Sequence, residues 1–154
     1  MNAPPTDPFR EDHRALLAEV ERLRLAAAEV AQLGPAEREV LVGHALAFLK
    51  GELVPHSEAE ERVLYPAVAD LLGALEATAP MIQDHTAIRA RIAELEQVDP
   101  RDLARLQELL YGLYALISVH FAKEEDLYLP LLEKAGPEVQ RVLEALGQLE
   151  SVPS

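Results

Sequence analysis

The sequence contains no cysteine at any of its 154 positions. Without thiols the chain forms no disulfide, thiolate zinc site or iron–sulfur cluster, and it has no cysteine nucleophile. The absence of this one residue type therefore excludes several classes of metal site and of enzyme.

Positive charge and long apolar runs are also scarce. The 14 Lys and Arg residues face 27 Asp and Glu, which leaves a net charge of −13. We therefore expect no nucleic-acid partner and no binding to anionic membranes. The longest apolar stretch, 109–119, is too short to span a bilayer and reads as a buried helix. Residues 1–8 lack a basic region followed by an apolar one, so no signal peptide is expected and a cytoplasmic location is predicted.

What the sequence does contain is typical of a single helical domain. Hydrophobic residues make up 49% and charged residues 27%. Apolar residues recur every three or four positions, and no segment alternates as a strand would. Proline residues that follow Asp, Gly or Thr closely, including Pro100, are typical of helix starts. The predicted main helices cover about 8–33, 35–65, 80–98 and 100–134, with a short piece near 67–77 and a terminal helix at about 137–150.

The chain repeats itself in two halves. Glu-Asp-His at 11–13 recurs as Gln-Asp-His at 83–85, and His-Ser-Glu-Ala-Glu-Glu at 56–61 recurs as His-Phe-Ala-Lys-Glu-Glu at 120–125. A proline follows each of the later runs, at Pro66 and Pro130. Two copies of a helical hairpin predict an all-α, up-down-up-down four-helix bundle with a pseudo-twofold axis. The predicted organisation is a disordered tail at 1–7, the bundle at 8–135, and a C-terminal helix and tail at 136–154.

Each later run places a histidine and a carboxylate four residues apart, on one face of a helix. In an up-down-up-down bundle the starts of the first and third helices meet the ends of the second and fourth. The histidines of the first hairpin lie equally far from its turn, about 30 Å. Those of the second hairpin differ by a few residues, which a longer turn would absorb. The six candidate metal ligands are His13, His56, Glu60, His85, His120 and Glu124.

Imidazole and carboxylate groups together favour iron or manganese, with zinc as a possible substitute. Two bridging carboxylates would leave two histidines for each of two ions and at least one open position, where a small molecule would bind or react. His44 lies about 18 Å along the helix from His56 and is left out of the site. Glu61 and Glu125 point about 100° away from the ligand face, so we expect them in solvent or behind the ligands.

Three further features carry expectations of their own. The four tyrosines could donate to a bound ligand, but at helical spacing among leucines they are expected to pack in the core; they are Tyr65, Tyr111, Tyr114 and Tyr128. Pro55 cannot donate to the carbonyl of Gly51, which predicts a kink just before His56. Arg89 lies one turn after His85 and is expected to pair with an acidic group, either at the site or on the surface.

This pattern, His…His-x-x-x-Glu…His…His-x-x-x-Glu with Glu-Glu and a following proline in both halves, resembles the hemerythrin-like, or HHE cation-binding, domain. The resemblance covers about residues 8–135. It implies a non-heme di-iron centre that handles oxygen, nitric oxide or cellular iron. Hemerythrin proper has a second histidine four residues after the one on its third helix, where this chain has Arg89. Ferritin-like di-iron proteins use Glu-x-x-His instead, and no such pair occurs here.

Three functions remain open from the sequence. The first is a di-iron protein that binds or senses oxygen, nitric oxide or iron itself, and the replacement by Arg89 moves the balance away from a dedicated oxygen carrier. The second is a di-iron enzyme that reduces peroxide or nitric oxide. The third is a metal-free helical scaffold for an unidentified protein partner.

Overall fold

The computed structural model describes the backbone of residues 6–150, and their side chains apart from those of 138, 139, 143 and 147–150. Residues 1–5 of the predicted N-terminal tail, and residues 151–154 at the C-terminus, lie outside the described residues. Within this part of the chain every regular element is helical, as the sequence predicts. The helices are α1 (Asp7–Glu29), α2 (Pro35–Phe48), α3 (Val54–Ala59), α4 (Tyr65–Leu72), α5 (Ala79–Gln97), α6 (Leu103–Lys123), α7 (Leu129–Lys134) and α8 (Pro137–Glu150).

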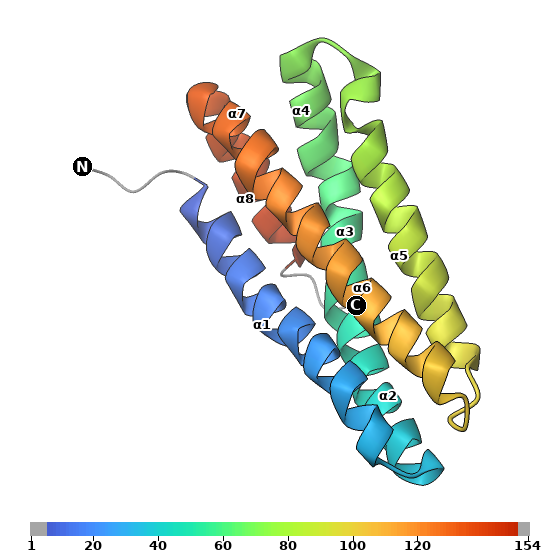
Figure 1. Cartoon of the computed structure of the whole chain (residues 1–154). Coiled ribbons are helices and arrows are strands. Elements are labelled where there is room, and N and C mark those ends of the chain that lie inside the picture. Colours follow the sequence, from blue (N-terminus) through green and yellow to red (C-terminus); the bar gives the residue numbers. More distant parts are fainter. Residues whose placement is uncertain (1–5, 151–154) are drawn as a thin grey trace.

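The helices form the predicted up-down-up-down bundle (Figure 1). In Figure 1, α1 runs down, the continuous rod of α2, α3 and α4 runs up, α5 runs down, and α6 continues up into α7. The start of α1, the end of α4, the start of α5 and α7 therefore lie at one end. The most extensive packing is that of α6 against α1 and α5, and α8 packs against α3. No helix among the described residues is long and apolar enough to cross a bilayer.

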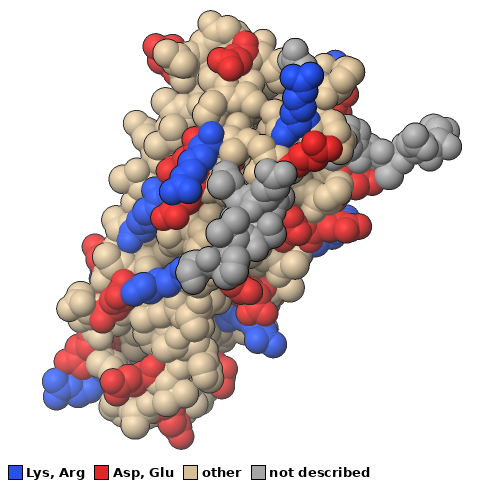
Figure 2. All heavy atoms as spheres, turned by 180° about the vertical axis from the view of Figure 1, so that it is seen from behind, with Lys and Arg blue, Asp and Glu red and all other residues tan. Residues whose placement is uncertain are grey.

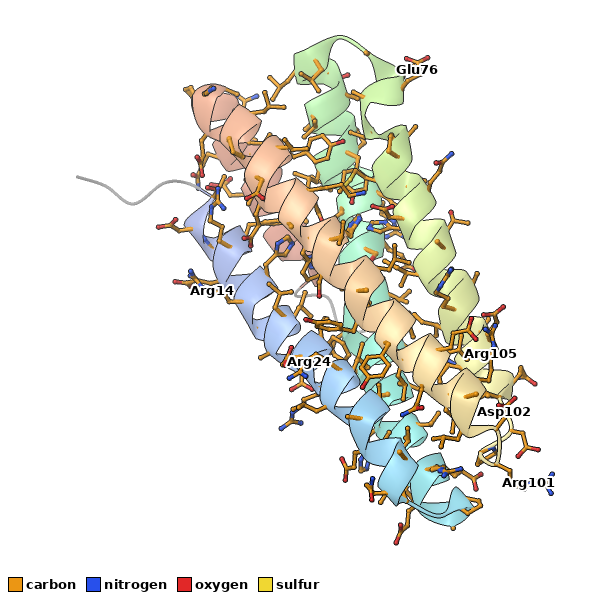
Figure 3. All side chains as sticks on the ribbon, in the orientation of Figure 1. Arg14, Arg24, Glu76, Arg101, Asp102 and Arg105 are labelled. Atoms are coloured by element: carbon orange, nitrogen blue, oxygen red, sulfur yellow. The ribbon has the colours of Figure 1, made fainter. Side chains whose placement is uncertain are left out.

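Two predicted helix boundaries differ from the structure. α1 begins at Asp7, one residue inside the predicted tail, and Thr6 before it is buried. α6 begins at Leu103 instead of 100, because Asp102 caps it: its Oδ1 accepts from the backbone N–H of Arg105 at 3.0 Å. Figure 3 shows Asp102 and Arg105 together at the turn between α5 and α6, far from Glu76 at the other end of the bundle.

The end of the second long helical segment, which consists of α2, α3 and α4 with the turns between them, also differs from the prediction. This segment continues to Leu72 instead of ending at 65. It ends at Gly73, whose φ of 67° places it in the left-handed region that favours glycine. The predicted short piece is then only a 3-10 turn, Leu75–Thr78. Pro66 lies inside this longer helical segment, although a proline in a helix interior usually interrupts it.

Three π-helical turns allow the long helical segments to continue through a proline without ending. They span Leu49–Leu53, Glu60–Leu64 and Glu124–Tyr128, and in each case a proline follows two residues later. A proline ring crowds the carbonyl four residues earlier and offers that carbonyl no N–H. The wider turn lets the residue just before the proline donate five residues back instead, as Tyr65 N does to the Glu60 carbonyl. The distortion expected before His56 is therefore a π turn, and two of the predicted ligands, Glu60 and Glu124, begin such turns.

The apolar core consists of two clusters that flank the candidate ligands. One fills the half of the bundle near the α1–α2 turn and includes Leu23, Leu49 and Leu110. The other lies at the opposite end, includes Leu64, and receives Leu146 from α8. On all four rods the candidate histidines fall in sequence between members of the two clusters. This packing holds the polar centre rigidly and away from water.

Candidate metal centre

The six predicted ligands are all buried, although they come from four different rods. The most exposed of them, His56, has 5% of its surface accessible, and Glu60 and Glu124 have 0%. Ionisable side chains are almost never buried without a partner or a metal. The structure therefore brings the predicted residues together inside the bundle. Atoms of five of them form two groups that share Glu60, and the ligand atoms of each group lie within 4.8 Å of one another.

The first group joins α1 to the second rod. His13 Nε2 lies 3.6 Å from Glu60 Oε1, and His56 Nε2 lies 2.5 Å from the same oxygen. The second group uses the other oxygen of that carboxylate. His85 Nε2 lies 3.3 Å from Glu60 Oε2 and His120 Nε2 lies 3.9 Å from it. Glu60 therefore faces one histidine pair with each oxygen, which is the arrangement of a carboxylate between two metal positions.

Glu124 lies beside the second group and belongs to neither set of three. Its Oε1 is 2.9 Å from His120 Nε2, yet neither of its oxygens has a hydrogen-bond partner. A buried carboxylate without hydrogen bonds is costly unless a cation compensates it. The predicted bridging role of Glu124 stays a prediction, whereas its position next to His120 is observed.

Carboxylates stand behind three of the histidines and contact the ring nitrogen that faces away from the centre. His13 Nδ1 is 3.2 Å from Glu125 and His85 Nδ1 is 2.8 Å from Glu61. An ionised carboxylate only accepts, so each Nδ1 donates, and in a neutral imidazole the Nε2 then carries the lone pair that a metal needs. These two contacts cross between the two halves of the repeat. The alternative that Glu61 and Glu125 lie behind the ligands is thus the one observed.

The third such carboxylate is Asp84, which sequence reasoning missed. Its Oδ2 lies 2.9 Å from His120 Nδ1 and 2.5 Å from Lys123 Nζ. Its signal was the repeated Asp-His pair, because Asp84 directly precedes His85 just as Asp12 precedes His13. Arg89 does not enter the centre: its Nη1 donates to Glu61 at 3.1 Å. The positively charged side chains of Arg89 and Lys123 thus contact Glu61 and Asp84, the two carboxylates behind His85 and His120.

The pKa values of the two central carboxyl groups are shifted in opposite directions. Burial alone would raise the pKa of Glu60, but the imidazole of His56 and those of His120 and His13 hold this pKa well below its usual value. Burial and the charge of Glu60 hold the pKa of Glu124 well above its usual value. Two nearby carboxylates without a cation resist ionising together. Behind the histidines, Arg89 and His85 lower the pKa of Glu61 despite its partial burial, and Lys123 and His120 do the same for Asp84.

Tyr65 corrects one expectation. Its ring is buried as predicted, with 1% of its surface accessible, but its hydroxyl is not simply packed in the core. It donates to Glu60 Oε2 at 3.0 Å and lies 3.2 Å from both His85 Nε2 and His120 Nε2. Burial and the charge of Glu60 raise the pKa of Tyr65 far above its usual value in the metal-free protein. The hydroxyl belongs to the second group.

Around the first group, apolar aromatic rings take the place that the Tyr65 hydroxyl has in the second group. The His13 ring stacks on Phe121 with centroids 4.3 Å apart and planes only 5° apart. Phe9 covers another side of His13, with centroids also 4.3 Å apart. The predicted ligand set is nearly symmetric between the two halves, but its surroundings are not.

The donor set fits a bound cation. His85 and His120 bring their Nε2 atoms to 2.9 Å of each other while carboxylates occupy both Nδ1 atoms. With both imidazoles neutral and donating through Nδ1, the two Nε2 lone pairs face each other at this separation, which favours a positive charge between them. Buried atoms of the other members, namely His13 Nε2, Glu60 Oε1 and both Glu124 oxygens, also lack hydrogen-bond partners. Nitrogen and oxygen donors of this kind suit iron, manganese or zinc.

A family model places this arrangement among known domains. The model described as the hemerythrin HHE cation-binding domain matches residues 5–147. The chain belongs to this family. The match confirms the resemblance drawn from the motif and extends it beyond 8–135 at both ends. Comparisons with curated proteins and with solved structures found no match. As a member of the HHE family with a buried cluster of histidine and glutamate, the protein has the features of a metal-binding domain, and the metal in this family is typically iron.

Proposed function

We propose that this HHE domain holds two iron ions and uses them to bind or sense a small molecule such as oxygen or nitric oxide, or iron itself. One observation carries the proposal: the two oxygens of Glu60 face two separate histidine pairs. In this assignment His13 and His56 hold one ion, His85 and His120 hold the other, and Glu60 and Glu124 lie between them. Iron would supply reversible electron transfer and open coordination positions for the ligand.

The residues around the centre determine which molecules can reach it and which charge it carries. Complete burial of the ligands restricts access to molecules of the size of oxygen, nitric oxide or peroxide. The carboxylates behind His13, His85 and His120 accept from each Nδ1 and aim each Nε2 inward. Two ionised bridging carboxylates would offset part of the charge of two cations, which favours binding of both ions.

Metal loading without oxygen tests the proposal. Iron(II) is added anaerobically to the full chain, and metal content and the optical spectrum are measured before and after air, nitric oxide or azide. We expect two irons per chain and visible bands that respond to these ligands. A chain that takes up iron without any spectral response, or that takes up none, would contradict the proposal. Parallel loading with manganese and zinc establishes which metal is preferred.

The same sample separates the remaining functions. Consumption of peroxide or nitric oxide over many turnovers would identify a reductase, whereas stoichiometric binding identifies a sensor or carrier. A metal-free scaffold predicts only trace metal that does not depend on His56 or His120.

On the face that Figure 2 shows, acidic and basic side chains are interspersed. The absence of a nucleic-acid partner and the cytoplasmic location both stay predictions.

A further inference from the structure

We propose that Tyr65 is a seventh ligand residue of this centre and a third kind of ligand beside histidine and glutamate: its phenolate oxygen binds the metal ion held by His85 and His120. This inference rests on the proposed function, because it assigns a role at the same metal pair. Tyr65 OH is surrounded by three candidate ligand atoms, at 3.0 Å from Glu60 Oε2 and at 3.2 Å from each of the two histidine Nε2 atoms.

The spacing of these four atoms is that of ligands around one ion. At metal–ligand distances of about 2.1 Å, neighbouring ligand atoms lie about 3.0 Å apart at right angles and about 3.4 Å apart in a tetrahedron. The separations that involve the Tyr65 oxygen are 3.0, 3.2 and 3.2 Å. The other separations are 2.9 Å between His85 and His120, and 3.3 and 3.9 Å from these two to Glu60 Oε2. The hydroxyl fits this set as closely as the predicted ligands do.

Hydrogen bonds satisfy this cluster only in part when both imidazoles are neutral. The phenol has one proton, and in that state Glu60 Oε2, His85 Nε2 and His120 Nε2 all present lone pairs to it, because the Nδ1 atoms donate to Glu61 and Asp84. Donation to Glu60 then leaves both imidazole nitrogens facing the phenol oxygen at 3.2 Å. A metal ion resolves the conflict: its binding displaces the phenol proton to solvent, and all four atoms then donate to the cation.

Only one half of the repeat has this ligand. Tyr65 follows His56 by nine residues, and the position nine after His120 is Leu129, which is fully buried and apolar. The ion between His13 and His56 has no such oxygen and is walled by the rings of Phe9 and Phe121. The proposal therefore makes the two ions unequal, with the open position for a small molecule at the first one.

Resonance Raman spectroscopy of the iron-loaded, oxidised full chain tests the assignment. Excitation into a phenolate-to-iron(III) charge-transfer band should enhance tyrosinate ring modes, and these modes should shift in protein grown with ring-deuterated tyrosine. Tyr65→Phe should lose both the band and the modes. Tyr128→Phe is the matched control, because its hydroxyl donates instead to the Ala77 carbonyl at 2.9 Å and it should keep both.

Each outcome decides the question. Absence of tyrosinate modes in the wild type, or their persistence in Tyr65→Phe, overturns the proposal and leaves Tyr65 as a hydrogen-bond donor. If Tyr65→Phe fails to fold by circular dichroism, a chain in which Tyr111, Tyr114 and Tyr128 are all phenylalanine replaces it, and this variant must retain the modes. A chain that binds no iron overturns both proposals, whereas a di-iron chain without tyrosinate modes overturns only this one.

Discussion

Asp84 Oδ2 lies 2.9 Å from His120 Nδ1, so the residue just before one candidate ligand orients another candidate ligand on a different helix. Removing the charge of Asp84 should therefore weaken metal binding, although Asp84 is not itself a candidate ligand. We expect Asp84→Asn to weaken iron binding about 10- to 100-fold, measured by competition with a chelator of known affinity. Asp126→Asn, an exposed change two residues after Glu124, should leave the affinity unchanged. Equal affinities in both variants would contradict an orienting role.

Glu60 and Glu124 should differ in how much metal each retains. Glu60 belongs to both groups of ligand atoms, whereas Glu124 lies 2.9 Å from His120 and belongs to neither group. We expect Glu60→Ala to lose both ions and Glu124→Ala to keep part of the iron, as measured by metal analysis per folded chain. His44→Gln, an exposed change outside the centre, should bind iron as the wild type does. Full iron content in Glu60→Ala would exclude a bridging position for this residue.

Acid should weaken the attachment of α1 to α7. The hydroxyl of Thr6 donates to Glu133, Arg10 pairs with the same carboxylate at 3.2 Å, and these partners lower the pKa of Glu133. A lowered folded-state pKa contributes stability that is fully present above the unfolded value of about 4.3 and is lost as the pH falls through the folded value. In urea unfolding across pH, Glu133→Gln should thus be less stable than the wild type at neutral pH, and the difference should disappear in acid. A difference that does not change with pH would show that the charge of Glu133 contributes nothing.

Two glycines should respond oppositely to alanine. Gly73 ends α4 with a φ of 67°, so a side chain there costs about 1–2 kcal/mol of folding free energy, although a Cβ atom would meet no other atom within 4 Å. Gly43 lies inside α2 with equally open surroundings, and alanine there should stabilise by about 0.5–1 kcal/mol. Chemical denaturation of Gly73→Ala and Gly43→Ala measures both. Changes of the same sign would show that backbone conformation does not control these positions.

The helical architecture could be predicted because periodicity and proline positions are local signals. The predicted helix boundaries were wrong where the local preference of a proline competes with a hydrogen bond made by a nearby residue. Pro66 should end a helix, but the π turn before it lets the rod continue to Leu72. Pro100 should begin a helix, but the side chain of Asp102 caps a later start. Both outcomes depend on which backbone groups find a partner, and residue preferences alone do not reveal that.

By itself the sequence determined which residues face the centre, because two histidine-carboxylate pairs at four-residue spacing and an internal repeat leave little freedom on a helix. The six predicted ligands follow from this, as does the family. Only the tertiary structure decided what surrounds them. Asp84 reaches His120 across 36 residues of sequence, and Tyr65 reaches His85 across 20 and His120 across 55. Helical spacing specifies a face on one helix, whereas contacts between helices depend on how the rods pack, and this packing makes the two halves of the centre unequal.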